Sequence, residues 1–331
     1  MKRIWITKKG GPEVLQLREE PDPVPAPGEV RIRVKAAGVN FADVMARVGL
    51  YPDAPKLPAV VGYEVAGVID APAERAGERV VAMTRFGGYS DVVCVPSAFV
   101  FPLPEKLSFV QGAAMPVVWL TAWHMLVELG HLRRGQRVLV QAAAGGVGTA
   151  AIQICRHVGA EVIGTASPGK HERLRKLGIT HAIDYADFDT RALELTGGRG
   201  VDLALDAVGG ASFRRSFRAL APAGKLMMFG ASATISGTTR SFLTALGTVA
   251  RMPVFFPLPL MQSNKGVFGI NMGRLWGEID LLGGELREVF RGVEEGAFQP
   301  IIDLEVPFSE AGRAHQRLQD RENFGKVVLV P

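Results

Sequence analysis

A glycine-rich turn is the feature of this sequence with the clearest chemistry. The segment AAAGGVG stands between the apolar run RVLV and the helix-forming run TAAIQICRHV. In the dinucleotide fingerprint G-x-G-x-x-G, the middle glycine lets the backbone approach a pyrophosphate and the last lets the helix pack on the strand. Gly145 and Gly148 take these two positions, and Ala143 takes the first. The order strand, turn, helix predicts a dinucleotide site; the alternative is a turn that serves packing alone.

The helix after this turn is expected to hold the pyrophosphate. The amides of Gly146 and Val147 lie at its N-terminus, where unpaired N–H groups and the helix dipole favour an anion. The residues after the next strand then indicate which dinucleotide binds.

An NAD site of this type places Asp or Glu at the end of the next strand, about 20 residues on, to hold the ribose 2′-hydroxyl. That strand, EVIGTAS, ends at Thr165 and Ser167 without an acid, and Lys170 follows. Hydroxyl donors and a positive charge suit a 2′-phosphate, so NADPH is the expected cofactor. Alternatively, Lys170 and Arg173 form only the solvated face of a helix.

These residues require a scaffold of alternating strands and helices. The pattern predicts strands at 138–142, 161–165, 181–183, 201–205, 225–229 and 266–270, and helices near 146–157 and 169–177. Such alternation is typical of a doubly wound parallel sheet of the Rossmann type. Before residue 120, short apolar or alternating runs split by turn residues predict a mostly antiparallel β body. GRLWGEIDLLGGELREVFRGVEEG is expected to be helical, and the closing strand to return to the first domain.

Composition limits the classes of function. The 331 residues are 47% hydrophobic and suffice for two cores. The net charge of +5 is carried by scattered Lys and Arg, without the clustered cations that nucleic-acid binding needs. Two cysteines are too few for a disulfide framework. With no signal-like N-terminus and with prolines and an arginine in the most apolar stretch, we expect a cytoplasmic protein without a membrane span.

Motifs along essentially the whole chain resemble a known family. They are AAGVNFADVMARVGLYP, LPAVVGYEVAGVI, AGERVVA, AAAGGVG, VDLALDAVGG, PAGKLMMFG and GKVVLVP. The chain is similar to medium-chain dehydrogenases/reductases of the zinc-independent quinone oxidoreductase branch, and most like the vesicle amine transport protein homologues. The resemblance implies a GroES-like domain at 1–120, a Rossmann NADP-binding domain at 121–269, and a return to the first domain at 270–331.

Zinc-dependent relatives carry a catalytic cysteine and a histidine where this chain has Asn40 and Tyr63. Glu64 remains, but one carboxylate cannot replace the three protein ligands of a catalytic zinc. No metal is therefore expected. Without a Lewis acid an isolated ketone is hard to reduce, whereas a quinone or an α,β-unsaturated carbonyl delocalises the charge that hydride brings.

The resemblance also implies roles for single residues. Asn40 is expected beside the nicotinamide, with a loop-capping side chain as the alternative, and Tyr51 near the substrate, where a phenol polarises a carbonyl. Tyr63 is expected either as a core aromatic or as a proton donor. Thr121 is expected near the nicotinamide or as a helix N-cap. The remaining cofactor contacts that the resemblance implies are Tyr185, Phe229, Gly230, Phe268, Gly269 and Asn323.

The sequence predicts an NADPH-dependent oxidoreductase that reduces quinones or α,β-unsaturated carbonyls. One alternative is an enoyl-thioester reductase of polyketide or fatty-acid metabolism. Another is a nucleotide-binding, membrane-associated protein with weak catalysis, suggested by the apolar segment PVFFPLPLMQ, which could also line a substrate pocket or form a dimer contact. Stable membrane binding is not expected. A homodimer is expected, because GVFGINM would form an edge strand that a two-fold partner can extend.

Overall fold

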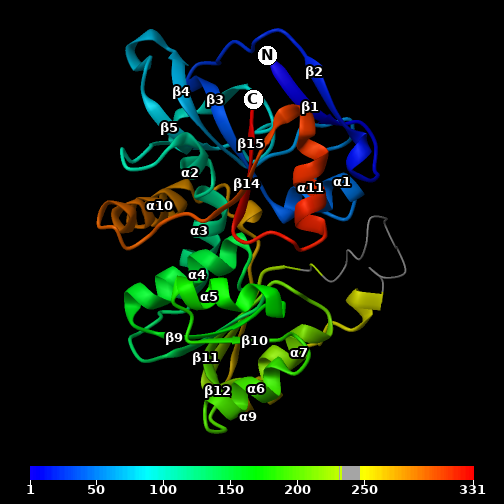
Figure 1. Cartoon of the computed structure of the whole chain (residues 1–331), viewed down its shortest axis with the longest axis vertical. Helices are drawn as coiled ribbons and strands as arrows, with labels where there is room; N and C mark the ends of the chain where they lie inside the picture. The colour runs from blue at the N-terminus through cyan, green and yellow to red at the C-terminus, as the bar shows by residue number, and fades with distance from the viewer. Residues whose placement is uncertain (231, 233–246) are drawn as a thin grey trace. The chain divides into compact units, whose positions relative to one another are not determined.

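The computed structural model describes residues 1–230, 232 and 247–331. These residues form two compact units (Figure 1). One comprises Met1–Leu120 and Met272–Pro331, and the other comprises the described residues from Thr121 to Asn271. Nothing among the described helices is both long and apolar enough to cross a membrane.

The first unit is built around a seven-stranded sheet in the order β14-β15-β3-β4-β5-β7, with β6 also paired to β3. Its pairings are antiparallel except for β14 with β15. The closing strand therefore joins β3, as the sequence predicts. The elements are β1 (Lys2–Ile6), β2 (Leu15–Glu19), β3 (Glu29–Val39), α1 (Phe41–Val48), β4 (Glu64–Ala71), β5 (Arg79–Met83), β6 (Val92–Pro96), β7 (Val100–Pro102), α2 (Phe109–Ala113), α10 (Ile279–Glu294), β14 (Ile302–Pro307), α11 (Ala311–Gln319) and β15 (Lys326–Val330).

Strand β3 illustrates why this sequence forms such a sheet. Its residues alternate, so that Ile32 and its apolar neighbours enter the core while Arg31 and Arg33 face the other way. Both guanidinium groups bind Asp70 of β4, through Nε–Oδ distances of 2.8 and 2.5 Å. The alternation fixes which face is buried, and the two ion pairs agree with the pairing of β3 and β4.

The second unit contains a six-stranded sheet in the order β10-β9-β8-β11-β12-β13, and all its pairings are parallel. Numbered along the chain this is 3-2-1-4-5-6, the Rossmann order, which reverses direction between β8 and β11. Helices α4 and α5 are neighbours, as are α6 and α7 (Figure 1). The elements are β8 (Arg137–Val140), α4 (Gly146–Val158), β9 (Glu161–Thr165), α5 (His171–Leu177), β10 (His181–Ile183), α6 (Phe188–Leu195), β11 (Val201–Asp206), α7 (Ala211–Arg218), β12 (Leu220–Met228), α9 (Pro257–Ser263) and β13 (Gly266–Gly269).

The expected fold class, a Rossmann-type sheet with a mostly antiparallel β body, is confirmed. Three of the predicted element boundaries are wrong. Strand β12 begins at Leu220 and not at 225; between Leu220 and Lys225 its register with β11 shifts and Ala223 has a positive φ of 64°, which is where Pro222 and Gly224 suggest a turn. The helix expected from residue 273 begins at Ile279, after a single 3-10 turn at Met272–Arg274. Likewise, α5 is preceded by a 3-10 turn at Pro168–Lys170.

Candidate functional site

The β8–α4 turn has the geometry of an anion site. Gly145 is the N-cap of α4. The backbone N–H groups of the first turn of α4 have no acceptor within the helix, because no helical turn precedes them. A Cβ at Gly148 would lie 2.4 Å from the carbonyl oxygen of Ala143, so the helix packs directly on the turn. At Gly145 a Cβ would meet only the Ala142 oxygen, at 3.4 Å. Gly148 is thus required by the protein itself, whereas Gly145 leaves its outer side open.

Thr165, predicted as a cofactor contact, supports the turn from inside. Its side chain is fully buried; its Oγ1 accepts the Ala142 N–H at 3.1 Å and donates to Oε1 of Gln141 at 2.8 Å. The Thr165 carbonyl also accepts the N–H of Ala143 at 2.9 Å. The hydroxyl therefore holds β9 against the turn, a role that follows from its burial at the strand's last position.

The end of β9 carries the residues expected to select the cofactor. Ser167 is exposed, and its carbonyl accepts the Lys170 N–H at 2.9 Å in the 3-10 turn that begins α5. Nε2 of His171 lies 3.0 Å from the Ala166 carbonyl oxygen and fixes this turn to the strand. No carboxylate stands between Thr165 and Lys170. Ser167 and Lys170, which are predicted to bind a 2′-phosphate, therefore lie in one turn with no carboxylate between them.

The acid at the end of the central strand β11 is structural. Asp206 is fully buried and accepts the Val208 and Gly209 N–H groups at 2.8 and 3.2 Å. Its other oxygen accepts the hydroxyls of Ser212 and Ser216 at 2.7 and 2.6 Å. With four donors bound to it, Asp206 ties β11 to α7.

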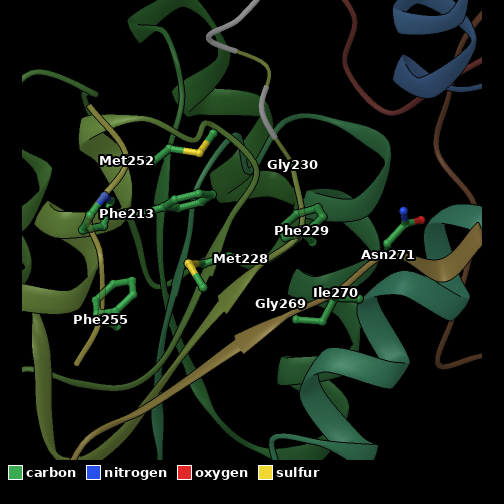
Figure 2. A pocket seen from close by; sticks show the side chains of 10 residues that line it. Phe213, Met228, Phe229, Gly230, Met252, Phe255, Gly269, Ile270 and Asn271 are labelled. Atoms are coloured by element: carbon green, nitrogen blue, oxygen red, sulfur yellow. The ribbon is translucent and has the colours of Figure 1, made fainter. Parts of the chain in front are cut away.

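A cavity of about 480 Å³ lies where β12 and β13 end. Figure 2 shows three of the predicted cofactor contacts, Phe229, Gly230 and Gly269, at one end of it, and Phe213, Met228, Met252 and Phe255 at the other. A Cβ on Gly230 would lie 2.6 Å from the Ala207 carbonyl oxygen, so glycine is needed there for backbone packing as well. Phe268 lies within β13 and is half-buried.

The apolar segment 253–261 contributes to this cavity with alternate residues. Pro253 and Phe255 line it. Val254 and Phe256 point outward, with 75% and 62% of their surface exposed. In α9, Leu258 and Met261 are likewise exposed. One side of the segment therefore lines the cavity, and its other side is apolar and exposed to solvent.

In the first unit Asn40, Glu64 and Lys326 form a buried polar cluster. Lys326 Nζ lies 2.6 Å from Asn40 Oδ1 and 2.5 Å from Glu64 Oε1, and Asn40 Nδ2 donates to the same Oε1 at 2.8 Å. Glu64 Oε2 accepts the Val117 N–H at 2.7 Å. The Asn40 side chain is thus held in place by the Glu64–Lys326 ion pair.

This cluster does not fit a zinc ion. A catalytic zinc takes three ligands from His, Cys and carboxylate groups. Around Glu64 the neighbours are a neutral amide and an ammonium ion, and the ammonium already neutralises the carboxylate. The described residues contain no group of three potential ligands elsewhere. The described residues therefore do not provide the ligand set of a catalytic zinc ion.

Tyr51 and Tyr63 belong to an aromatic cluster in the same unit. Their rings meet edge to face at 6.4 Å, and Tyr63 also contacts Phe86 at 5.2 Å and Trp276 at 6.4 Å. Burial, and then the neighbouring Tyr51 phenol, raises the pKa of Tyr63; burial also raises the pKa of Tyr51. Both phenols therefore stay protonated at neutral pH. Tyr63 is 6% exposed and fits the packing role, while Tyr51 is half-buried.

Asp43 connects the elements that carry these side chains. It is fully buried in the first turn of α1 and accepts the N–H groups of Asn40 and Gly62 at 2.8 and 3.0 Å. The Tyr89 hydroxyl lies 3.2 Å from Asp43 and 3.1 Å from Nε2 of His315. Burial raises the pKa of Asp43 to about 7 and lowers that of His315.

Three further predicted residues are placed as follows. Thr121 is buried in the middle of α3 (Pro116–Trp123), so the N-cap alternative is wrong; a π-helical turn at His124–Glu128 follows it. Asn323 donates from Nδ2 to the Gly325 carbonyl at 2.9 Å in the loop before β15. Tyr185 follows β10 and is 40% exposed.

Sequence reasoning missed Lys326, Trp276 and Gln141. Two of these had a usable signal: Lys326 and Gln141 are single polar residues at the ends of apolar strand runs, in GKVVLV and RVLVQ. A polar group there is buried with a partner or faces a ligand. Trp276 carried no such signal, because it lies in a segment predicted to be helical.

The chain matches two family models. Residues 26–105 match the alcohol dehydrogenase GroES-like domain, and residues 146–282 match the zinc-binding dehydrogenase model. The human synaptic vesicle membrane protein VAT-1 homolog is 38% identical over 337 residues, which cover 99% of this chain and 86% of that protein.

Two solved structures are also similar. Escherichia coli quinone oxidoreductase, solved in complex with NADPH, is 31% identical with a TM-score of 0.87, and the match covers the whole of both chains. CurK enoyl reductase is 27% identical with a TM-score of 0.86, covering 99% of this chain and 98% of that one.

Proposed function

Because the chain belongs to the medium-chain dehydrogenase/reductase superfamily, close to the VAT-1 homologues, we propose that it is an NADPH-dependent oxidoreductase that reduces quinones or α,β-unsaturated carbonyls without a metal. The observation that carries the proposal is the β8–α4 turn, whose open amides and close-packed Gly148 suit a dinucleotide pyrophosphate. The solved relative with NADPH bound supports the same cofactor.

Several residues hold the cofactor in this proposal. Gly145, Gly146 and Val147 face the pyrophosphate. Ser167 and Lys170, after β9, receive the 2′-phosphate, since no acid there repels it. The remaining contacts, Tyr185, Phe229, Gly230, Phe268, Gly269, Thr121 and Asn323, are proposed on the family resemblance.

The acceptor is proposed from the chemistry of the first unit. NADPH supplies the hydride when bound. The negative charge that then develops on a quinone or enone oxygen needs a donor, and the protonated phenol of Tyr51 supplies one. Tyr63 supports the Tyr51 ring through their edge-to-face contact. Lys326 and Glu64 fix the Asn40 amide, which we propose beside the nicotinamide.

The test is NADPH oxidation with a 1,4-quinone, an alkenal and an enoyl thioester, each with and without a chelator. We expect turnover that survives the chelator and prefers NADPH over NADH. Lys170→Ala should reduce that preference about tenfold or more, because it removes a charged hydrogen bond. Equal use of NADH and NADPH by the wild-type protein would contradict the cofactor assignment. Turnover of the enoyl thioester alone would favour the enoyl reductase alternative, which the CurK similarity supports.

A second candidate function rests on the outer side of segment 253–261. Four apolar side chains are exposed on this side: Val254, Phe256, Leu258 and Met261. Such exposed apolar side chains suit contact with the surface of a lipid bilayer. In this alternative the protein binds nucleotide and associates with a membrane surface while catalysing weakly. Co-sedimentation with liposomes, with and without NADPH, tests it; a protein that stays in the supernatant in both cases rules it out.

A further inference from the structure

The cavity of about 480 Å³ has an apolar end with a composition suited to a ligand. Figure 2 shows Phe213, Met228, Met252 and Phe255 gathered at this end, from α7, from β12 and from residues 252–255. None of the described residues that line the cavity is charged. Its volume lies in the usual range of small-molecule sites, whose walls are mostly apolar. Since a charged group would lose its hydration there without gaining a partner, the apolar end suits a neutral hydrocarbon group.

The walls of this end combine rigid and adaptable side chains. Phe213 is 7% exposed, and the ring of Phe255 packs on that of Phe217 with 5.1 Å between centroids. Met228 and Met252 are half-buried and pack against the core of the parallel sheet. Methionine is unbranched and polarizable, so it adjusts to an irregular apolar shape. These walls therefore suit a flexible chain better than one ligand of fixed shape.

The other end of the cavity lies among residues proposed above as cofactor contacts. Phe229, Gly230 and Gly269 line it, and Asn271 contributes a polar side chain (Figure 2). A Cβ on Gly269 would meet no atom within 4 Å, so the backbone at this point borders open space. A molecule that reacts at the cofactor would therefore have its apolar part directed toward Phe213 and Met252.

We propose that the apolar end of this cavity holds a hydrocarbon chain of the acceptor, so that the protein prefers quinones or enones that carry a long apolar chain. The inference rests on the NADPH-dependent reduction proposed above and narrows its class of substrate. Because burial of apolar surface drives such binding, each methylene group that enters the cavity should strengthen it about threefold.

Calorimetry on the full chain without NADPH tests the site in the absence of turnover. The probes are saturated methyl ketones from hexan-2-one to decan-2-one. We expect the Kd to fall about threefold with each added methylene until the cavity is filled. A wild-type Kd that changes less than twofold across the series overturns the proposal.

Two matched pairs of variants place the chain in the cavity. Met252→Gln introduces an amide among the apolar walls, while Met261→Gln makes the same change at a side chain of α9 that is 73% exposed and outside the lining. Phe255→Ser removes one wall, while Phe256→Ser changes its neighbour, which is 62% exposed on the outer side. We expect the two cavity variants to bind decan-2-one about fivefold or more weakly and the two controls to bind as wild type. Thermal unfolding checks that the cavity variants are folded.

NADPH oxidation identifies which acceptor carries the chain. The substrates are 2-alkenals from 2-pentenal to 2-decenal and 1,4-benzoquinones that carry alkyl chains over the same range. In one of the two series we expect kcat/KM to rise about thirtyfold or more from the shortest to the longest substrate. That ratio should fall in Met252→Gln and Phe255→Ser and persist in Met261→Gln and Phe256→Ser.

The failure of this inference is distinct from the failure of the proposed function. Folded cavity variants that bind decan-2-one within twofold of wild type overturn the chain site. A protein that reduces quinones or enones without dependence on chain length keeps its proposed function and loses this inference. A protein that binds the longer ketones through Met252 and Phe255 but reduces no acceptor keeps an apolar chain site and loses the proposed function.

Discussion

Two glycines of the same turn are needed for different reasons. Gly148 is enclosed by the backbone of Ala143, whose carbonyl oxygen would lie 2.4 Å from an added Cβ, while at Gly145 the nearest atom would lie 3.4 Å away. The first distance is impossible for a real Cβ, and the second is tolerable. At the scale of single residues, the fingerprint therefore combines a folding requirement with a binding requirement.

We expect Gly148→Ala to destabilise the protein by about 2 kcal/mol or more, because the helix must move off the turn. Gly145→Ala should leave the free energy of unfolding within about 1 kcal/mol of wild type but weaken NADPH binding, since the added methyl stands where the pyrophosphate approaches. Urea unfolding and NADPH titration of both variants measure the two effects. A Gly145→Ala variant that binds NADPH normally would contradict the proposed position of the pyrophosphate.

At the scale of elements, Asp43 holds α1 to the segment before β4 and, through Tyr89, to α11. Three donors converge on it, from Asn40, Gly62 and Tyr89. Burial nevertheless raises its pKa from 3.8 to about 7, so charging it in the folded state is unfavourable. The carboxyl binds a proton more tightly when folded than when unfolded, and its contribution to stability is lost as the pH rises toward 7.

From this shift we expect the wild-type protein to lose about 2–3 kcal/mol of unfolding free energy between pH 5 and pH 8 through Asp43. In Asp43→Asn that loss should be absent, because the group no longer titrates. Glu74→Gln, at an exposed carboxylate, should keep the wild-type loss. The opposite contribution of His315, whose pKa burial lowers, is common to all three proteins and cancels in the comparison. Urea unfolding at both pH values measures this loss of unfolding free energy. An equal loss in Asp43→Asn would show that the titration of Asp43 does not cause it.

The sequence predicts the elements well where apolar period and turn residues agree, as at β9, β10 and α4. At β12 the strand begins at Leu220, earlier than predicted, but Pro222 and Gly224 lie in an irregular stretch, and the regular pairing with β11 begins only at Lys225. In the site the sequence predicts the β8–α4 turn. It does not predict that Lys326 meets Glu64, since 262 residues separate them and their strands, β15 and β4, come together through the pairing of each with β3.

At the scale of the whole molecule, strand β13 is the edge of the parallel sheet in the described chain, and β10 is the opposite edge. An edge strand offers unpaired backbone groups that a second copy can extend across a two-fold axis. The exposed apolar residues of α9 immediately precede β13. We therefore keep the homodimer as a proposal, with β13 at its interface.

If two copies pair through β13, amide exchange in Gly266–Gly269 should slow as the protein concentration rises, because the edge amides become hydrogen-bonded. The equivalent amides of β10, His181–Ile183, are the internal control and should not change. Light scattering should give a mass near twice 35.5 kDa under the same conditions. A dimer in solution whose β13 amides exchange at a concentration-independent rate would place the interface elsewhere.

The cluster of Asn40, Glu64 and Lys326 has a consequence for biosynthesis. Glu64 leaves the ribosome 262 residues before the lysine that neutralises it, and the strand carrying that lysine is also the one that pairs with β3. The described strands of the parallel sheet all lie between residues 137 and 269 and have been synthesised by then. Maturation of the nascent chain would thus proceed from the nucleotide-binding sheet outward, and the β body around Glu64 would close last.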